Sequence, residues 1–372
     1  MNGVVYRLYG PSHKYICITL CVVGLLANII HIWVLTRPSM QNSSVHTVLT
    51  AIAMADIGTM ASYFTYLTRY EFNKDDNNLY SYWWTLFLQI HVLLSIALHA
   101  TSLYLVVLVA YIRLSAISKT NSPWLRRQIT RLAVATIAIL TLIVCLPTFF
   151  AHQIYPQTIY RCYVGQEYTE YIEFDGNNTV AIKCDYRSAE TRYSIGFSSL
   201  VLKNNCALLK INLWLTGIIL KAIPCALLLC LTFSLLIKLK ENKKKRKMLF
   251  GLNLNKRESD RTTYMLFLMV CVFLSTEFPQ GFIAVFNAIY TQQFHMYVYL
   301  ALADILDLLS LINCYVSFTV YFCTCSRYRR TFVTSLRFKG IFYFLYCYYL
   351  PNLLQTTFEN ENTAVLATQN SC

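Results

Sequence analysis

The chain has 372 residues, of which 56% are hydrophobic and 13% charged, and its formal net charge is +14. Soluble domains contain about 25% charged residues, so this composition excludes an ordinary soluble protein and predicts a membrane protein. A basic excess is also typical of nucleic-acid-binding proteins. Here, however, the basic clusters flank long apolar runs, as in membrane-flanking segments, and nucleic acid is not an expected partner.

Seven apolar runs are each long enough to cross a bilayer, which takes about 20 residues. In chain order the runs are Tyr15–Thr36, Val45–Tyr66, Trp84–Leu108, Ile129–Phe150, Leu208–Leu239, Thr262–Tyr290 and Met296–Cys323. The pattern predicts an all-α membrane protein, a seven-transmembrane helix bundle.

The basic residues between these runs predict the orientation of the bundle. With the N-terminus outside, the inner segments hold 21 of the 32 basic residues and the outer segments hold ten. Cytoplasmic loops carry an excess of Lys and Arg, so we expect an extracellular N-terminus. The expected organisation is a short outer segment at 1–14, a membrane domain at 15–323 with a basic inner loop at about 240–261, an amphipathic eighth helix on the inner surface at 324–340, and a cytoplasmic tail at 341–372.

The chain has fourteen cysteines, and most lie inside the apolar runs, where they act as small hydrophobic residues. No CxxC motif pairs with a second CxxC or with HxxxH, so no metal site is predicted. HExxH, GxSxG and Walker patterns are also absent from the sequence, and we do not expect an enzyme.

One outer segment, at about 152–205, is large enough to fold on its own. It contains Cys162 and Cys184, with Cys206 at its far end. Extracellular thiols tend to pair, and three cysteines leave one over. Pairing cannot be deduced from sequence alone, although we prefer Cys162–Cys184. The sequon at Asn177 predicts N-glycosylation of this segment.

Polar residues form a stripe along each of two runs. In the third run His91, Ser95, His99 and Ser102 are three or four residues apart and therefore share one helical face. The stripe of the seventh run contains Asp304, Asp307, Ser310, Asn313, Ser317 and Tyr321. Polar groups in a span usually face a protein interior, so the stripes predict a shared polar cavity. Taken singly, each residue could instead be a helix-packing or solvated group.

The sixth run carries an acid, Glu277, two residues before Pro279. Proline inside a helix removes a hydrogen bond and kinks the helix, and an acid at this depth needs a partner. Lys221, three residues before Pro224 in the fifth run, is a candidate. Two interpretations remain open at this stage: Glu277 contacts a ligand, or Glu277 forms an internal ion pair with Lys221.

Several motifs resemble one receptor family. Asn28 in the first run, and Asp56 at the end of LTAIAMAD in the second, look like those of rhodopsin-like G-protein-coupled receptors. More specific runs resemble invertebrate receptors for myosuppressin and FMRFamide-like peptides, which are relatives of the sex peptide receptor. These runs are HATSLYL, WLTGIILKAIPC, SDRTTYML, STEFPQG and VYLALADILDLLSLIN.

This resemblance implies a multi-pass plasma-membrane receptor in the lipid bilayer that binds a short amidated neuropeptide. It would signal through a heterotrimeric G protein, with the inhibitory class expected, by an outward swing of helix six. No cofactor is implied, although Na⁺ could bind near a polar core of Asp56, Asn28 and Asn313. The residues implied for the activation switch are Arg113, Phe273, Pro279, Ser317 and Tyr321.

The residues implied for ligand binding are His91, Ser95, His99, Lys221, Glu277, Gln280, Asp304 and Asp307. An arginine of the peptide would face Glu277, Asp304 or Asp307, where charge-assisted hydrogen bonds are strong. Ser95 stands where amine receptors carry an aspartate, which argues against a biogenic amine.

The sequence departs from the family pattern at several places: the segment Ser317–Tyr321 lacks the usual proline, Glu277 stands where many receptors carry a tryptophan, and the fourth run lacks its customary tryptophan. Arg113 lies in Ile112-Arg113-Leu114, without the usual neighbouring acid and tyrosine, and the outer end of the third run has no cysteine for a loop-to-helix disulfide. Two alternatives remain: a small-molecule chemosensory receptor of the same architecture, and an ion-coupled transporter or channel. The absence of internal repeats and the odd number of runs argue against a transporter.

Overall fold

The computed structural model describes residues 2–40, 43–74, 79–118, 123–164, 167–172, 183–203, 206–250, 256–290 and 294–336. The chain divides into two compact units, Met1–Thr324 and Cys325–Cys372. The second unit contributes one described helix, α11 (Ser326–Leu336), within the segment predicted at 324–340. The predicted tail at 341–372 and the sequon at Asn177 lie outside the described residues.

The described part of the first unit has seven long helical segments, as the hydropathy pattern predicts. In chain order these are α1 (Asn2–Leu35); α2 (Ser44–Tyr66) with η1 (Leu67–Phe72); α3 (Tyr82–Ser118); α4 (Arg127–Ala151); α6 (Ala207–Trp214) with η4 (Leu215–Ala222) and α7 (Ile223–Phe250); α8 (Lys256–Ile289); and η6 (His295–Tyr299) with α9 (Leu300–Asn313) and α10 (Val316–Thr324). By length and composition, six of them could cross a membrane. The remaining segment is α8, 34 residues long, which covers the predicted sixth run as far as Ile289.

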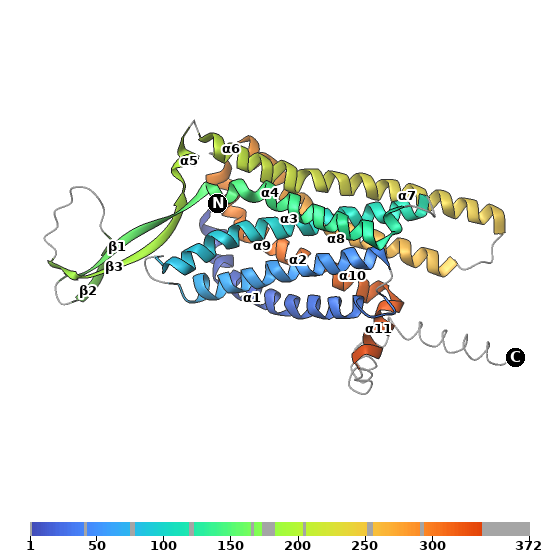
Figure 1. Ribbon diagram of the computed structural model, residues 1–372, viewed down its shortest axis with the longest axis horizontal. Coiled ribbons are helices and arrows are strands. Elements are labelled where there is room, and N and C mark those ends of the chain that lie inside the picture. The colour runs from blue at the N-terminus through green and yellow to red at the C-terminus, as the bar shows by residue number, and fades with distance from the viewer. Residues whose placement is uncertain are drawn as a thin grey trace. The chain divides into compact units, whose positions relative to one another are not determined.

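The long helices of this unit lie side by side, and three strands extend from one end of them (Figure 1). We call this end the sheet end; it contains the start of α3 and the end of α4, and the predicted orientation makes it extracellular. The opposite end contains the end of α3 and the start of α4. A 3₁₀ turn, η2 (Pro123–Leu125), precedes α4 there.

Two groups of small and apolar side chains hold the helices together. In one group Cys17 and Cys21 of α1 pack against Met60 of α2 and Cys314 near the end of α9. The other group joins α3, α4 and η4 through Ala97, Ala100, Cys145 and Leu220. Small side chains allow helix backbones to approach closely in a membrane protein. The cysteines of these runs are therefore part of the packing between helices.

A π-helical turn, η4, interrupts the fifth membrane segment just before Pro224. Within it the backbone N–H of Ile223 donates to the carbonyl oxygen of Ile218, five residues earlier. The same spacing would pair Ile219 with Pro224, which has no N–H to donate. Tyr104 of α3 donates its hydroxyl to the Ile219 carbonyl at 2.5 Å. The side chain of α3 therefore satisfies the carbonyl that the proline leaves without a backbone donor.

The outer segment after α4 forms an antiparallel sheet with strand order β2-β1-β3. Its strands are β1 (His152–Val164), β2 (Glu167–Ile172) and β3 (Lys183–Phe197). The register of β1 and β3 places Cys162 directly opposite Cys184. A further helical turn, α5 (Ser199–Leu202), follows β3.

Hydrogen bonds tie this sheet to the start of α3. The backbones of Tyr80 and Tyr193 pair with N···O distances of 3.0 and 2.8 Å. Gln89 of α3 also donates to the carbonyl oxygens of Phe149 and His152, at 3.1 and 3.0 Å. These contacts link the outer segment to the third helix at a place where the sequence has no cysteine for a disulfide.

Candidate functional site

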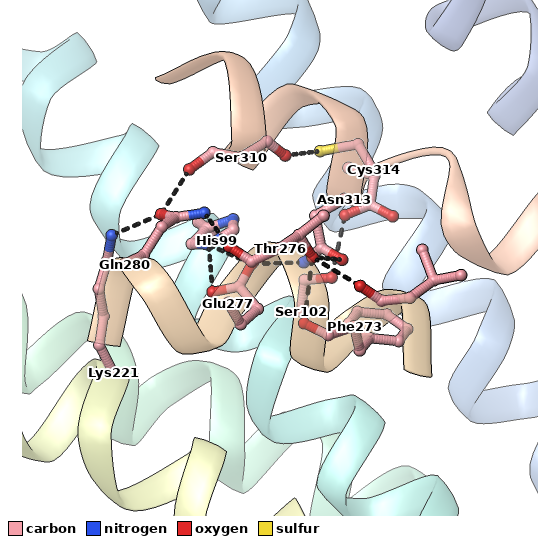
Figure 2. A network of polar contacts seen from close by, with 12 residues as sticks. His99, Ser102, Lys221, Phe273, Thr276, Glu277, Gln280, Ser310, Asn313 and Cys314 are labelled. Atoms are coloured by element: carbon pink, nitrogen blue, oxygen red, sulfur yellow. Dashed lines mark hydrogen bonds and ion pairs between the residues drawn. The ribbon is translucent and has the colours of Figure 1, made fainter. Parts of the chain in front are cut away.

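Three helical segments meet at the side-chain oxygen of Gln280, in the interior of the bundle (Figure 2). Lys221 of η4 donates from Nζ to Gln280 Oε1 at 2.9 Å, and Ser310 of α9 donates from Oγ to the same oxygen at 3.0 Å. The Gln280 amide nitrogen donates to the Thr276 carbonyl of its own helix at 3.1 Å. Gln280 is almost fully buried, and these bonds hold its side chain in one orientation.

Glu277 lies three residues before Gln280, on the same face of α8. It is 1% exposed, with its Oε1 3.2 Å from His99 Nε2 of α3. Asn313 of α9 donates to the same carboxylate oxygen at 2.7 Å. Among the described residues, no ion pair joins Glu277 to Lys221, which bonds to Gln280 instead (Figure 2). The internal partners of the acid are therefore His99 and Asn313, and a direct Lys221–Glu277 pair does not form.

Asp307 lies on α9, which packs against α1 and α8. Its side chain is exposed, and its Oδ2 accepts a hydrogen bond from the Tyr63 hydroxyl of α2 at 3.2 Å. In the described part of the chain no cationic side chain lies within ion-pair distance of it. Asp304, three residues earlier on the same face, is partly exposed. The site therefore presents an accessible negative charge.

Aromatic rings border this acidic region towards α2 and α3. His91 stacks with two of them: its ring centroid is 5.1 Å from that of Tyr66 and 5.9 Å from that of Phe87. The Tyr63 ring lies 6.0 Å from His91. His91 is buried, and its Nδ1 has no hydrogen-bond partner among the described residues. Ser95, one turn further along α3, is partly exposed and takes part in none of these contacts.

A second polar group lies between α1, α2, α3 and the end of α9. Ser102 donates to Asp56 Oδ1 at 2.9 Å, and the Asn28 amide nitrogen donates to the Cys314 carbonyl at 3.1 Å. Both Asn28 Oδ1 and Ser317 Oγ are buried with no partner among the described residues. Carboxylate, amide and hydroxyl oxygens are the ligands that hard cations prefer. The oxygen atoms of these side chains therefore fit the Na⁺ that the family resemblance implies.

Arg113 and Tyr321 join α3 to α10 nearer the opposite end. Arg113 donates from Nη2 to the Tyr321 hydroxyl at 2.8 Å, and the Tyr321 side chain is 1% exposed. The Tyr321 ring packs edge-on against His31 at 6.0 Å and against His46 at 6.3 Å. Phe273, also expected in the switch, is buried, whereas Pro279 is exposed on α8.

Comparison with known proteins decides the family. The family model "Serpentine type 7TM GPCR chemoreceptor Srw" matches residues 15–339. The chain belongs to this Srw family of G-protein-coupled receptors. It is also 30% identical, over 367 residues, to "G-protein coupled receptor dmsr-1" of Caenorhabditis elegans, with 88% of this chain and 68% of that protein covered. The receptor is therefore a multi-pass plasma-membrane protein, and its family is not enzymatic.

Some residues of the receptor's site were not selected from the sequence. Tyr63, the partner of Asp307, lies seven residues after Asp56 and therefore on the same face of α2. On α1, His31 follows Asn28 by three residues and therefore also shares a helical face with a residue that was selected. Extending the polar faces of the first two helices by one or two turns would have found both residues. Tyr66 and Phe87 gave no such signal, because aromatic residues are common at membrane interfaces.

Proposed function

We propose that this Srw-family receptor binds a short amidated neuropeptide of the FMRFamide-like or myosuppressin-like kind. The peptide enters from the sheet end and places its arginine against Asp307. The observation that carries this proposal is the exposed Asp307 carboxylate, which Tyr63 orients and which has no ion-pair partner among the described residues. A carboxylate inside a membrane bundle is costly unless it has a function or a partner.

A guanidinium group suits this site better than a small ammonium group does. Arginine binds carboxylates through two parallel hydrogen bonds and also stacks on aromatic rings. Asp304 lies one turn from Asp307, and the rings of Tyr63 and Tyr66 lie beside them. Aromatic faces attract cations and also accommodate a phenylalanine side chain. The site therefore supports a ligand that carries arginine next to an aromatic residue.

Of the three acids first considered for the ligand's arginine, Glu277 is the least suitable. His99 and Asn313 already satisfy it, and it is 1% exposed. We assign Glu277 to the connection between α3, α8 and α9 beneath the ligand. A peptide that alters the position of Gln280 or Glu277 would act on α8 directly.

The signal then passes to a heterotrimeric G protein at the opposite end, which is predicted to be cytoplasmic. Binding would favour a conformation in which the inner end of α8 swings outward, as a population shift. Arg113 and Tyr321 would change partners in this transition. The inhibitory G-protein class and Na⁺ bound near Asp56 belong to the same proposal.

A second candidate function is a chemoreceptor for small molecules. The family description favours it, because it names Srw proteins as chemoreceptors. A neutral volatile or lipid ligand would make no use of the charge of Asp307. The two functions therefore differ in whether the ligand needs a positive charge.

The test is expression of the full chain in cells with a promiscuous G-protein reporter. The cells would be exposed to amidated peptides such as Phe-Met-Arg-Phe-amide and, separately, to volatile and lipid odorants. We expect peptide responses, and we expect their potency to fall strongly, without being abolished, when citrulline, which has a similar shape and no charge, replaces the arginine. Responses to odorants alone would support the chemoreceptor, and equal potency of the citrulline peptide would exclude Asp307 as the anchor.

A further inference from the structure

Lys221 is a half-buried cation in the bundle, and among the described residues it makes one hydrogen bond, to a neutral partner. Its ammonium group donates to Gln280 Oε1, and no carboxylate lies within 4.0 Å of it in the described part of the chain. A lysine has three N–H donors, and unsatisfied charge at such depth is costly. Lys221 therefore has donors to offer to a ligand.

Ser310 offers the complementary group beside it. Its hydroxyl hydrogen is directed to the same Gln280 oxygen, at 3.0 Å, so its own oxygen lone pairs are available as acceptors. Both lone pairs of Gln280 Oε1 are occupied, and its amide nitrogen is tied to Thr276 (Figure 2). Gln280 thus fixes one donor, Lys221, and one acceptor, Ser310, next to each other.

We propose that Lys221 and Ser310 form the subsite for the C-terminal carboxamide of the ligand, an inference that rests on the proposed peptide function. Lys221 donates a hydrogen bond to the carboxamide oxygen, and the carboxamide NH₂ donates to Ser310 Oγ. A primary carboxamide carries this donor and this acceptor on one carbon atom. A carboxylate has two acceptors and no donor, so the lone pairs of Ser310 Oγ would receive no hydrogen bond from it.

The surrounding charge favours the same neutral group. Glu277, Asp304 and Asp307 carry formal negative charges in this half of the bundle, against the positive charge of Lys221. A peptide with a free C-terminal carboxylate would add a further negative charge to these surroundings. The subsite therefore explains how the receptor would select amidated peptides over the same peptides with a free acid.

The experiment compares Phe-Met-Arg-Phe-amide with its free acid on the full chain in the reporter cells. For the wild type we expect the amide to be more potent by about tenfold or more, because in the acid complex the Ser310 acceptor faces a carboxylate oxygen that has no hydrogen to donate. In Ser310→Ala the amide should lose potency while the acid keeps its own, so the ratio of their potencies falls. Ser234→Ala is the matched control, because among the described residues the Ser234 hydroxyl bonds to the Cys230 carbonyl of its own helix and to nothing else.

Lys221→Met provides a second variant, in which both peptides should lose potency because both use an acceptor there. Surface expression of each variant is measured in parallel. An unchanged ratio in Ser310→Ala, or unchanged amide potency in Lys221→Met, would overturn the carboxamide subsite while leaving the peptide function intact. If neither peptide binds the wild type, the proposed peptide function fails as well.

Discussion

His99 Nε2 of α3 lies 3.2 Å from Glu277 Oε1 of α8, and this contact pairs the acid beside Pro279 with a histidine. Lys221→Glu and Glu277→Lys should therefore each impair peptide signalling, and combining the two substitutions should not restore it. The swapped lysine would face His99 and Asn313, which are suited to a carboxylate. Recovery of peptide signalling in Lys221→Glu/Glu277→Lys would contradict this arrangement.

The same contact predicts coupling between two substitutions. Glu277→Ala and His99→Ala should each lower the thermal stability of the detergent-solubilised receptor, because each leaves a buried polar group without its partner. The double variant should lose less than the sum of the two, by roughly 0.5–3 kcal/mol of coupling. Melting of the purified single and double variants measures this difference. Strictly additive losses would mean that the two side chains do not interact.

Asp307→Asn should reduce the potency of an arginine-containing peptide with little change in surface expression. A hydrogen bond to a charged group contributes about 1.5–3 kcal/mol, which corresponds to a loss of roughly 10- to 150-fold. Because Tyr63 donates to Asp307 at 3.2 Å, Tyr63→Phe should produce a smaller loss in the same direction. The matched comparison is the citrulline peptide, whose potency should barely differ between wild type and Asp307→Asn.

Much of the fold could be predicted from the sequence, because crossing a bilayer imposes a length and an apolar character on each helix. The polar stripes were also predictable, since a periodicity of 3.6 residues places His91, His99 and Ser102 on one face, and all three are buried. What the pattern could not supply is the partner of each polar group. That depends on the rotation of neighbouring helices about their axes.

Lys221 illustrates the limit. It lies in the π-helical turn η4, which inserts an extra residue into the turn and rotates the side chains that follow. The side-chain directions of an ideal α-helix therefore do not predict whether Lys221 contacts Glu277 or Gln280, which are three residues apart on α8. The β-sheet after α4 was not predicted either, because a hydrophilic loop of this length shows no clear alternation of apolar and polar residues.

Tyr321→Phe should raise the basal signalling of the receptor. It removes the 2.8 Å hydrogen bond from Arg113, which here joins α3 to α10 where the sequence lacks the usual acid beside the arginine. Losing a bond of about 0.5–1.5 kcal/mol should shift the conformational equilibrium by roughly two- to tenfold. Reporter output without ligand, normalised to surface expression, measures the effect. Lower basal output with normal expression would argue against a restraining role for this bond.

Cys162 and Cys184 should form a disulfide, since they are opposite each other in the antiparallel pairing of β1 and β3. Opposed residues in such a pair have Cα atoms about 4.5–5.5 Å apart, within the range that a disulfide spans. Mass spectrometry of a non-reduced digest should therefore find a peptide linked through these two cysteines. Cys162→Ser and Cys184→Ser should each abolish this linked peptide, whereas the control Cys206→Ser should leave it unchanged. A linkage that involves Cys206 would replace this assignment.

Tyr104→Phe should destabilise the fifth membrane segment, because the Ile219 carbonyl then loses the hydroxyl that bonds it at 2.5 Å. The expected loss of thermal stability corresponds to about 0.5–1.5 kcal/mol. Pro224→Ala should lessen this loss, since alanine supplies the backbone N–H that proline lacks and can donate to Ile219 across the π-helical turn. Melting of the purified receptor in four forms, namely wild type, the two single variants and the double variant, tests this compensation. If Tyr104→Phe costs as much with alanine at position 224 as with proline, the hydroxyl is not there to replace the missing donor.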